Sequence, residues 1–528
     1  MNNTIPLVIG VTGHRNIRKE DRTALYAAVC AELNRLKERF LHSRLIMLNS
    51  LAEGADLLCA EAAKALSIPV IAALPMACSE YEKDFSGEAL ISFRSAYEST
   101  EERFVVPATE QENGADPREF AYRQAGIYVA THAHILLALW DGEKGTSGCG
   151  TAETVAFMRE GSFRPARNPL LRKPGCVIHV FAPRTEEEAA QPAGTVRFLG
   201  DPKALEDILK STDTFNRLAT KQTGQTEKLL PPDEEPDAFS SRLEQLYGTA
   251  DALSLRFGKR YRRLLAALAI ISTILTVAFL LYDEAELHGM ILVCGGMLLA
   301  AFLLLQFGTK SASHRRYLEY RTLAENLRVQ IFLHLAGSGI TVAAVLPWSE
   351  REETAWVAAA LEVLVIGKPQ RAPSPIRDCW VRAQRRYHSE AKKKSTRTAV
   401  GSGRIVTIAT RMSITLYLAV LAFELLWGGL LPLPWSFAKT ETIRTAAKLL
   451  LGSISAATLF IANYYGKLSL PRVVSDHEKM ERLYESVDRK LDREGQTDEL
   501  LMLLAREELI ENANWCAYQR DNGIDFNL

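Results

Sequence analysis

The sequence lacks the signatures of several common classes of protein. None of its eight cysteines falls in a CxxC pair, so neither a zinc site nor a disulfide framework is indicated and a reducing compartment is expected. The chain has no basic excess, because Lys plus Arg and Asp plus Glu both number 63, and we therefore expect no direct DNA binding. No basic segment followed by an apolar one opens the chain, which favours an N-terminus that stays in the cytosol.

Catalytic patterns are missing from the first half of the chain as well. It contains no HExxH motif, nucleophile elbow, P-loop or paired carboxylates. We therefore predict no catalytic residue, no metal ligand and no cofactor. The chain does have ample length, 528 residues, with 47% hydrophobic and 24% charged residues. This composition excludes disorder and fibres, and the length suggests about three folding units.

Four apolar segments after position 260 are long enough to cross a bilayer, which takes about 20 helical residues. Residues 264–282 and 287–307 contain no Asp, Glu, Lys or Arg, and a four-residue turn joins them, which predicts a helical hairpin. Basic residues flank the outer ends of this hairpin: Lys259, Arg260, Arg262, Arg263, Lys310, Arg315 and Arg316. By the positive-inside rule, both outer ends and the first half of the chain lie in the cytosol.

Residues 413–431 and 449–465 predict a second hairpin with similar basic flanks. Glu424 and Asn463 interrupt it, and within a bilayer they should face the interior of the bundle, as pore-lining residues or as contacts between helices. A buried core of a large soluble protein is the alternative for all four segments, but the charge asymmetry favours the membrane. We expect a multi-pass protein of the inner (plasma) membrane with both terminal regions in the cytoplasm.

Each hairpin is followed by an apolar stripe with helical spacing, which suggests a duplicated unit. The stripes are Tyr320, Ala324, Leu327, Ile331 and Leu335, and Met480, Leu483, Val487 and Leu491. We expect these helices to couple the hairpins to each other or to another subunit of a homo-oligomer. We divide the chain into a ligand-binding domain (1–185), a linker with a coupling helix (186–258), a first hairpin with cytosolic helices (259–366), a basic linker (367–411) and a second hairpin with cytosolic helices (412–528).

The first 183 residues alternate between strand and helix signals, which predicts an open parallel α/β sheet with helices on both faces. The predicted strands are short apolar runs, as expected for strands buried on both faces. They cover 7–11, 45–49, 69–74, 104–106, 133–140 and 176–181. In such sheets, ligands bind beyond the carboxyl ends of the strands.

Distinctive residues follow four of these strands. Glycine lets a backbone approach a ligand, Arg15 can bind phosphate through two nitrogens, and the amides at a helix start attract anions. The candidate ligand-binding residues are Gly10, Thr12, Gly13, His14, Arg15, Ser50, Leu51, Glu53, Gly54, Asp56, Pro75, Tyr81, Trp140, Asp141, Gly142, Gly148, Gly150 and Thr151. Together they predict a nucleotide-like ligand. The alternative is that these turns only end strands and begin helices, and that His14 is a structural hydrogen-bonding residue.

Several short motifs stand at these turns: GVTGHR (10–15), SLAEGAD (50–56), Leu74-Pro75, Glu80-Tyr81, Asp84-Phe85, WDG (140–142) and GCGTAETV (148–155). In combination they resemble the SLOG superfamily, the Rossmann-like nucleotide-binding domains shared by LOG cytokinin-activating phosphoribohydrolases and bacterial sensor proteins. The paired spans, with the residues AENLR (324–328) after the first pair and Glu511-Asn512 after the second, are similar to the two-span SLATT effector modules. The resemblance implies a bacterial antiphage effector that senses a nucleotide-derived messenger, such as a cyclic nucleotide or an ADP-ribose derivative, and perturbs the membrane.

One departure bears on enzymatic activity. The LOG motif PGGxGTxxE ends in a catalytic glutamate, but here Thr154 occupies that position and Glu153 lies one residue earlier. A shift of one residue turns a helical side chain by about 100°, so binding without turnover is expected. Two alternatives stay open. One is a membrane-tethered nucleotide hydrolase that uses Glu53, Glu153 or Asp141, and the other is a constitutive ion channel with a vestigial sensor.

Overall fold

The computed structural model describes most of the chain, namely residues 3–107, 116–143, 150–160, 174–184, 191–222, 228–230, 236–427 and 441–521. The chain divides into two compact units, each described by itself below. The sheet unit comprises Met1–Ala250, Thr322–Ser374 and Leu501–Ala513. The hairpin unit comprises Asp251–Arg321, Pro375–Leu500 and Asn514–Leu528.

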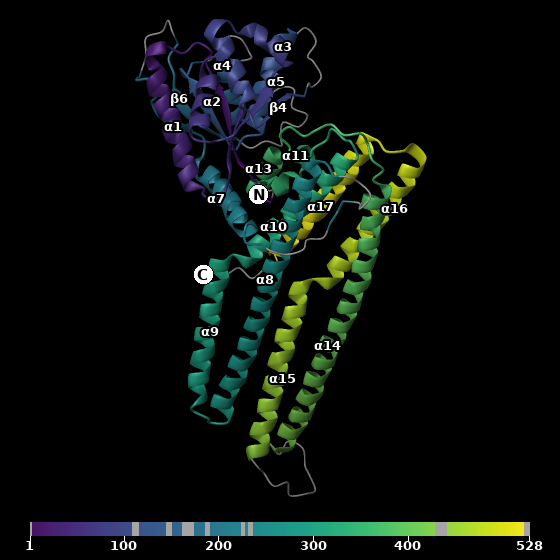
Figure 1. Ribbon diagram of the computed structural model, residues 1–528. Coiled ribbons are helices and arrows are strands. Elements are labelled where there is room, and N and C mark those ends of the chain that lie inside the picture. The colour runs from purple at the N-terminus through teal and green to yellow at the C-terminus, as the bar shows by residue number, and fades with distance from the viewer. Residues whose placement is uncertain are drawn as a thin grey trace. The chain divides into compact units, whose positions relative to one another are not determined.

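A seven-stranded sheet forms the centre of the sheet unit, with the strand order β4-β3-β2-β1-β5-β6-β7. Figure 1 shows this sheet among its helices and labels β4 and β6. Neighbouring strands are parallel except β6 and β7, which are antiparallel. The strands are Leu7–Gly13 (β1), Leu45–Asn49 (β2), Val70–Leu74 (β3), Glu102–Val105 (β4), Ile135–Trp140 (β5), Cys176–Phe181 (β6) and Val196–Leu199 (β7). The predicted fold class, an open, mostly parallel α/β sheet followed by a helical region, is confirmed.

Helices cover both faces of this sheet. The connecting helices are Arg22–Arg39 (α1), Ala55–Ala65 (α2), Cys78–Tyr81 (α3), Gly87–Glu98 (α4), Pro117–Thr131 (α5) and Thr151–Glu160 (α6). Leu7, Ile9 and Val11 of β1 share one hydrophobic core with α1 and α2, whereas Gly10 faces Val129 of α5. Because successive strand residues point to opposite faces, α1 and α2 lie on one face and α5 lies on the other.

The sheet unit extends past residue 185, where the sequence predicted a linker. Residues 196–199 form the edge strand β7, and Pro202–Ala219 forms the amphipathic helix α7. The Asp201 side chain caps α7 by accepting hydrogen bonds from the backbone N–H groups of Lys203 and Ala204, at 2.9 and 3.2 Å. The predicted boundary at 185 is therefore too early, because the short, half-exposed β7 carries no continuous apolar signal.

Residues 322–374 also belong to the sheet unit, although the sequence grouped them with the first hairpin. They contain Val342–Val345 (α11), Trp348–Glu353 (α12) and Ala355–Leu364 (α13). Helix α13 is buried and packs against α7, where the ring centroids of Trp356 and Phe215 lie 5.9 Å apart. Residues 322–374 thus pack within the sheet unit, where α13 contacts α7.

The hairpin unit is built from long helices. They are Ala238–Glu284 (α8), Met290–Ser311 (α9), Ser313–Leu335 (α10), Ala383–Trp427 (α14), Glu441–Leu468 (α15), Leu470–Glu494 (α16) and Asp498–Asp521 (α17), and α8, α10 and α17 each continue into the sheet unit. In the described part of the chain, four helices are long and apolar enough to cross a membrane, as predicted. They are α8, α9, α14 and α15, or their continuations.

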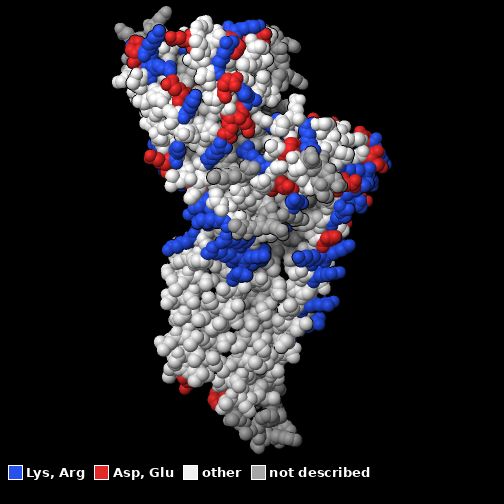
Figure 2. All heavy atoms as spheres, in the orientation of Figure 1, with Lys and Arg blue, Asp and Glu red and all other residues white. Residues whose placement is uncertain are grey.

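Large apolar side chains on these helices are exposed. Leu292 on α9, Ile408 on α14 and Leu459 on α15 are each more than half exposed to solvent. Figure 2 shows this part of the hairpin unit as an uncharged surface next to a belt of Lys and Arg. Many exposed large apolar side chains on neighbouring helices are unusual in soluble monomers, and a belt of cations beside an apolar band is typical of a membrane boundary.

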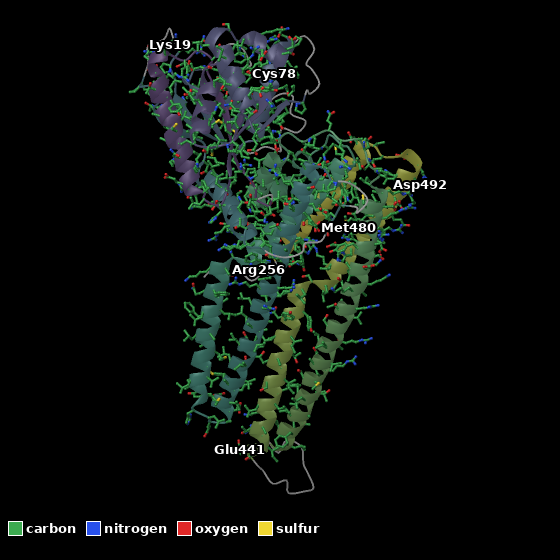
Figure 3. All side chains as sticks on the ribbon, in the orientation of Figure 1. Lys19, Cys78, Arg256, Glu441, Met480 and Asp492 are labelled. Carbon is green, nitrogen blue, oxygen red and sulfur yellow. The ribbon has the colours of Figure 1, made fainter. Side chains whose placement is uncertain are left out.

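Helix α14 replaces most of the predicted basic linker at 367–411, because residues 383–427 form one continuous helix. It packs against α16, where Met480, Tyr484 and Val487 are buried; Figure 3 labels Met480 there. The opposite side of α14 carries five exposed cations at intervals of seven or four residues, which places them on one helix face. We call Arg386, Lys393, Arg397, Arg404 and Arg411 the basic row.

We predict that Asn216→Ala destabilises the sheet unit. Asn216 Oδ1 accepts a hydrogen bond from Ile5 N–H, and its Nδ2 donates to Ile5 O, both at 2.8 Å and fully buried. Alanine leaves both backbone groups without partners, which should cost on the order of 3 kcal/mol of unfolding free energy. Thermal unfolding of the detergent-solubilised protein measures this. Asn34→Ala, on the exposed side of α1, is the control, and equal midpoints for both variants would contradict the assignment of α7 to this core.

Candidate functional site

The candidate site lies at the carboxyl end of β1. This strand pairs with β2 on one side and with β5 on the other, so the chain reverses direction across the sheet at β1. Open α/β sheets bind ligands at such a topological switch point. His14 and Arg15 directly follow β1, and Asp141 directly follows β5. The fold therefore brings together two of the turns that the sequence selected.

His14 and Asp141 connect the ends of β1 and β5. His14 Nε2 lies 3.1 Å from Asp141 Oδ2 and 3.2 Å from the Asp141 backbone nitrogen. The His14 backbone N–H donates to Leu139 O at 3.0 Å. The Asp141 side chain is only 4% exposed, and its Oδ2 also lies 2.9 Å from Nε of Arg184. The Arg184 guanidinium offsets part of the cost of burying the Asp141 carboxylate.

Gly13 and Gly54 hold the β1 turn against the start of α2. A Cβ on Gly13 would lie 2.3 Å from Ala55 Cβ, and one on Gly54 would lie 2.1 Å from the Arg15 carbonyl oxygen. Gly54 also has a φ of +84°, which favours glycine. Contacts within the chain thus explain both glycines. Gly10 lies inside β1, where a Cβ would meet Val129 Cγ1 at 2.9 Å, and so it is away from the strand end.

The start of α2 is rigid and mostly buried. Asn49 Oδ1 accepts a hydrogen bond from Leu51 N–H at 2.7 Å, and its Nδ2 donates to Asp56 O at 2.9 Å. These bonds hold the buried Leu51 at a φ of +58°, an unusual value for a residue other than glycine. Ser50 is half-buried and Glu53 is exposed. Burial raises the pKa of the Asp56 carboxyl to about 7, against the influence of the Ala52 N–H and the Arg15 charge.

Arg15 belongs to a cluster around Asp84, the last residue of a short 3₁₀ turn (Glu82–Asp84). The Asp84 carboxylate accepts hydrogen bonds from the Tyr122 hydroxyl and from Arg118, both on α5. Arg15 Nη2 lies 3.6 Å from Asp84 Oδ2, and the Arg15 guanidinium stacks 5.0 Å from the Tyr122 ring centroid. Two guanidinium groups therefore share one carboxylate, with side chains 47% (Arg15) and 41% (Arg118) exposed.

Tyr81 and Pro75 form the buried floor next to this cluster. Tyr81 is 1% exposed and packs edge-on against Phe85 and Phe93, with ring centroids 5.2 and 5.6 Å away. Burial raises the pKa of Tyr81 well above its ordinary value. Pro75 is buried at the end of β3, and Thr12 is half-buried in β1. These residues shape the site, while Arg15 and Arg118 present charge to solvent.

The turn after β5 is held by hydrogen bonds among its own residues. Trp140 Nε1 donates to Glu143 O at 3.0 Å, and Asp141 Oδ1 accepts from Glu143 N–H at 2.9 Å. Gly142 has a φ of +93°, so this position also favours glycine. His179 Nε2 lies 2.8 Å from Trp140 O and supports the turn from β6.

The start of α6 differs from a LOG-like catalytic helix. Thr154 is buried, its backbone N–H donates to Gly150 O at 3.1 Å, and it packs against Gly126 of α5. Glu153 lies 4.0 Å from Arg123 Nε, and burial raises the pKa of Glu153. Thr151 is the first residue of α6, whereas Gly148 lies outside the described residues.

The polar residues predicted for the second hairpin lie in different settings. Glu424 forms an ion pair with Arg444 of α15, at 2.8 Å between Oε1 and Nε. It lies three residues before the end of α14, near the hairpin loop, and Lys448 of α15 pairs with Glu284 of α8 at 3.0 Å. Asn463 is exposed on α15 instead of facing the interior of this chain's bundle.

Sequence reasoning found Arg15, His14 and Asp141 but missed Arg118 and Tyr122. The available signal was the Asp116-Pro117 pair, in which Asp116 Oδ1 caps α5 by accepting from the N–H groups of Arg118 and Glu119. This cap predicts a helix start that places Arg118 in the first turn. Within the described residues, no group of three or more His, Cys, Asp or Glu could hold a metal ion.

The partly exposed guanidinium groups of Arg15 and Arg118 give the arrangement the charge to bind an anion. Comparison with protein-family models gives no match for this chain. No curated protein matches it either.

We predict that Gly54→Ala is strongly destabilising. The new Cβ would meet a backbone oxygen at 2.1 Å at a positive φ, so either the turn or α2 has to move. A loss on the order of 3 kcal/mol or more is expected. Gly87→Ala is the matched control, because Gly87 has a φ of +54° but no atom within 4 Å of its Cβ position. It should cost only about 1 kcal/mol. Thermal unfolding distinguishes the two, and similar losses would contradict the packing role of Gly54.

A second prediction concerns pH. The folded-state pKa of Asp56 is about 7, above its ordinary value of 3.8. Between these values only the folded state holds the proton, so the free energy of unfolding should fall as pH rises from about 4 to about 7, by up to about 4 kcal/mol. Asp56→Asn cannot ionise and should lack this decline, whereas Asp207→Asn on the exposed side of α7 should keep it. Unfolding curves at several pH values test this, and an unchanged decline in Asp56→Asn would refute it.

Proposed function

We propose that this chain is a ligand-gated membrane effector of bacterial antiphage defence. Its sheet unit binds a nucleotide-derived second messenger at the carboxyl end of β1, and its hairpins then disrupt or open the membrane. One observation carries the proposal: the exposed guanidinium groups of Arg15 and Arg118 lie at the topological switch point of a chain that also has four membrane-length helices.

The charge of the cluster formed by Arg15, Arg118 and Asp84 at the strand end, the strand-end cluster, favours a phosphate-bearing ligand. The guanidinium groups of Arg15 and Arg118 both contact the Asp84 carboxylate, and both side chains are partly exposed to solvent. A phosphate placed there can accept paired hydrogen bonds from a guanidinium group. The amides at the start of α6 and the rigid turn after β5 lie at the same sheet edge. The resemblance to SLOG domains agrees with such a ligand, a cyclic nucleotide or an ADP-ribose derivative.

The surface of the hairpin unit supports a bilayer partner. Exposed Leu292, Ile408 and Leu459 would face lipid at a lower free energy than water. The cations expected on the cytoplasmic side are the basic row and those that flank the first hairpin, namely Lys259, Arg260, Arg262, Arg263, Lys310, Arg315 and Arg316. In the proposed orientation, the N-terminal and C-terminal regions lie in the cytoplasm and the four spans cross the inner (plasma) membrane.

Assembly into a homo-oligomer explains how ligand binding could act on the bilayer. A ligand shifts a conformational equilibrium only by its difference in affinity for the two states. Asn463 is exposed on α15, where contact with lipid alone is unfavourable for an amide. A neighbouring subunit that covers Asn463 would remove this cost and would join spans from several chains around one pore.

We predict that nucleotide messengers release a trapped dye from liposomes that contain the wild-type protein. Arg15→Ala should raise the ligand concentration for half-maximal release about 10-fold to 100-fold, because it removes a charged hydrogen-bond donor. Arg35→Ala is the control, since Arg35 pairs with Glu32 on the exposed side of α1. Cyclic nucleotides and ADP-ribose derivatives are tested in turn.

The outcomes separate the candidate functions. Intact liposomes in the presence of bound ligand would refute the effector. Leakage without ligand that Arg15→Ala does not change would indicate a constitutive channel. Release of free base from the nucleotide would indicate a hydrolase, which the Glu153 and Arg123 contact and the buried Thr154 disfavour.

A further inference from the structure

Within the hairpin unit, an ion pair joins α15 of the second hairpin to α8 of the first. Lys448 Nζ lies 3.0 Å from Glu284 Oε2 and 3.4 Å from Glu284 Oε1, so both carboxylate oxygens contact the ammonium group. Glu284 is the last residue of α8, and Lys448 lies near the start of α15. The pair therefore connects the two hairpins directly.

One helical turn away from this ion pair, the same two helices are in close contact. Gly452 of α15 lies four residues after Lys448, and Leu280 of α8 lies four residues before Glu284. A Cβ on Gly452 would lie 2.6 Å from Leu280 Cδ1 and 3.2 Å from its Cδ2. Residues four apart share one face of a helix, so the ion pair and this contact belong to one interface between antiparallel helices.

A second ion pair ties α14 to the same part of α15. Glu424 Oε1 lies 2.8 Å from Arg444 Nε, and Arg444 lies four residues before Lys448. The charges of Glu424 and Lys448 also act on each other, as do those of Glu284 and Arg444. Two carboxylates and two cations therefore balance one another. We call these residues and the neighbouring contact the inter-hairpin clamp, namely Leu280, Glu284, Glu424, Arg444, Lys448 and Gly452.

The clamp lies at the end of the hairpins that is away from their basic flanks. Glu284 follows the predicted span 264–282, and Lys448 directly precedes the predicted span 449–465. Figure 3 labels Glu441, the first residue of α15, at this end. In the proposed orientation it is the outer side of the membrane. Where lipid covers the exposed part of these side chains, water and salt screen the pair less than on a soluble surface.

We propose that the inter-hairpin clamp is a gate: while it is closed the membrane stays tight, and the membrane opens only when α15 separates from α8. The inference rests on the proposed function, because it specifies the movement through which ligand binding acts on the bilayer. A ligand that favours the separated state has to supply the free energy that the clamp contributes to the closed state. Variants that weaken the clamp should therefore open the membrane without ligand.

Leakage of dye from liposomes that contain the full chain, measured without ligand, tests the contact between α8 and α15. Gly452→Leu adds a side chain where Leu280 already fills the space, and it should raise the leakage rate about 10-fold. Gly466→Leu is the matched control, because it makes the same change in the same helix where no atom lies within 4 Å of the Cβ position. A rate for Gly452→Leu no higher than that of the control would overturn the proposal.

Three further variants test the ion pair and decide the question should Gly452→Leu fail to fold. Glu284→Gln and Lys448→Gln should each raise leakage about 2-fold to 5-fold, as expected for a partly exposed pair. The double variant should leak no faster than the faster single variant, because either change alone breaks the same pair. Additive increases would contradict the clamp. Glu441→Gln is the control, since Glu441 is 74% exposed and pairs with Arg444 of its own helix.

A reversible cross-link tests whether the clamp has to open. Leu280→Cys combined with Gly452→Cys places two thiols at the close contact of α8 and α15, where oxidation with copper phenanthroline joins them. Cyclic AMP and ADP-ribose serve as the probes. The oxidised variant should release dye about 10-fold more slowly than the same sample after reduction. The wild type, oxidised and reduced in the same way, controls for its eight native cysteines.

The outcomes separate this inference from the proposed function. Undiminished dye release from the oxidised variant, once mass spectrometry has shown the cross-link, would overturn the gate. Absence of the cross-link would contradict the contact itself. If neither probe releases dye from the wild type, that result counts against the proposed function, and leakage from Gly452→Leu and Lys448→Gln without ligand still decides for or against the clamp.

Discussion

The close contact between the end of β1 and the start of α2 is the constraint on which the candidate site depends. Ala55 N–H donates to His14 O at 3.0 Å, and the absence of side chains at Gly13 and Gly54 allows this approach. The approach fixes the backbone on either side of Arg15, so that its guanidinium group can meet Asp84 and the aromatic ring from α5. A ligand would therefore meet a site whose backbone is already ordered, which lowers the entropy lost on binding.

Much of the sheet could be predicted because its strands are buried on both faces and appear as continuous apolar runs. β2 and β6 have the predicted bounds. β7 could not be found in this way, because Val196 and Arg197 at this edge are exposed and no apolar run marks the strand. The site was predictable where it follows a strand, as for Arg15. The site was not predictable where a residue such as Arg118 reaches it from a helix more than 100 positions later in the chain.

In the helical half of the chain, too, some features could be predicted from the sequence and others could not. Hydropathy located the four long apolar helices, because lipid-facing residues need no partner within the chain. It could not assign residues 322–374 to the sheet unit, since burial of Trp356 depends on Phe215 of a helix that precedes the first hairpin. It also divided α14 at residue 411, although Lys and Arg are good helix formers and the helix continues through them.

The basic row on α14 has a geometric consequence for any anionic surface beside it. From Arg386 to Arg411 it rises through 25 residues, about 38 Å at 1.5 Å each. That length exceeds the roughly 30 Å thickness of a bilayer's hydrocarbon core. In a helix tilted by 40° or less from the membrane normal, the phosphates of one leaflet form too thin a layer to meet all five cations. Those nearest Arg386 then lie outside the phosphate layer, where carboxylates of the chain, dissolved counterions or another macromolecule balance them.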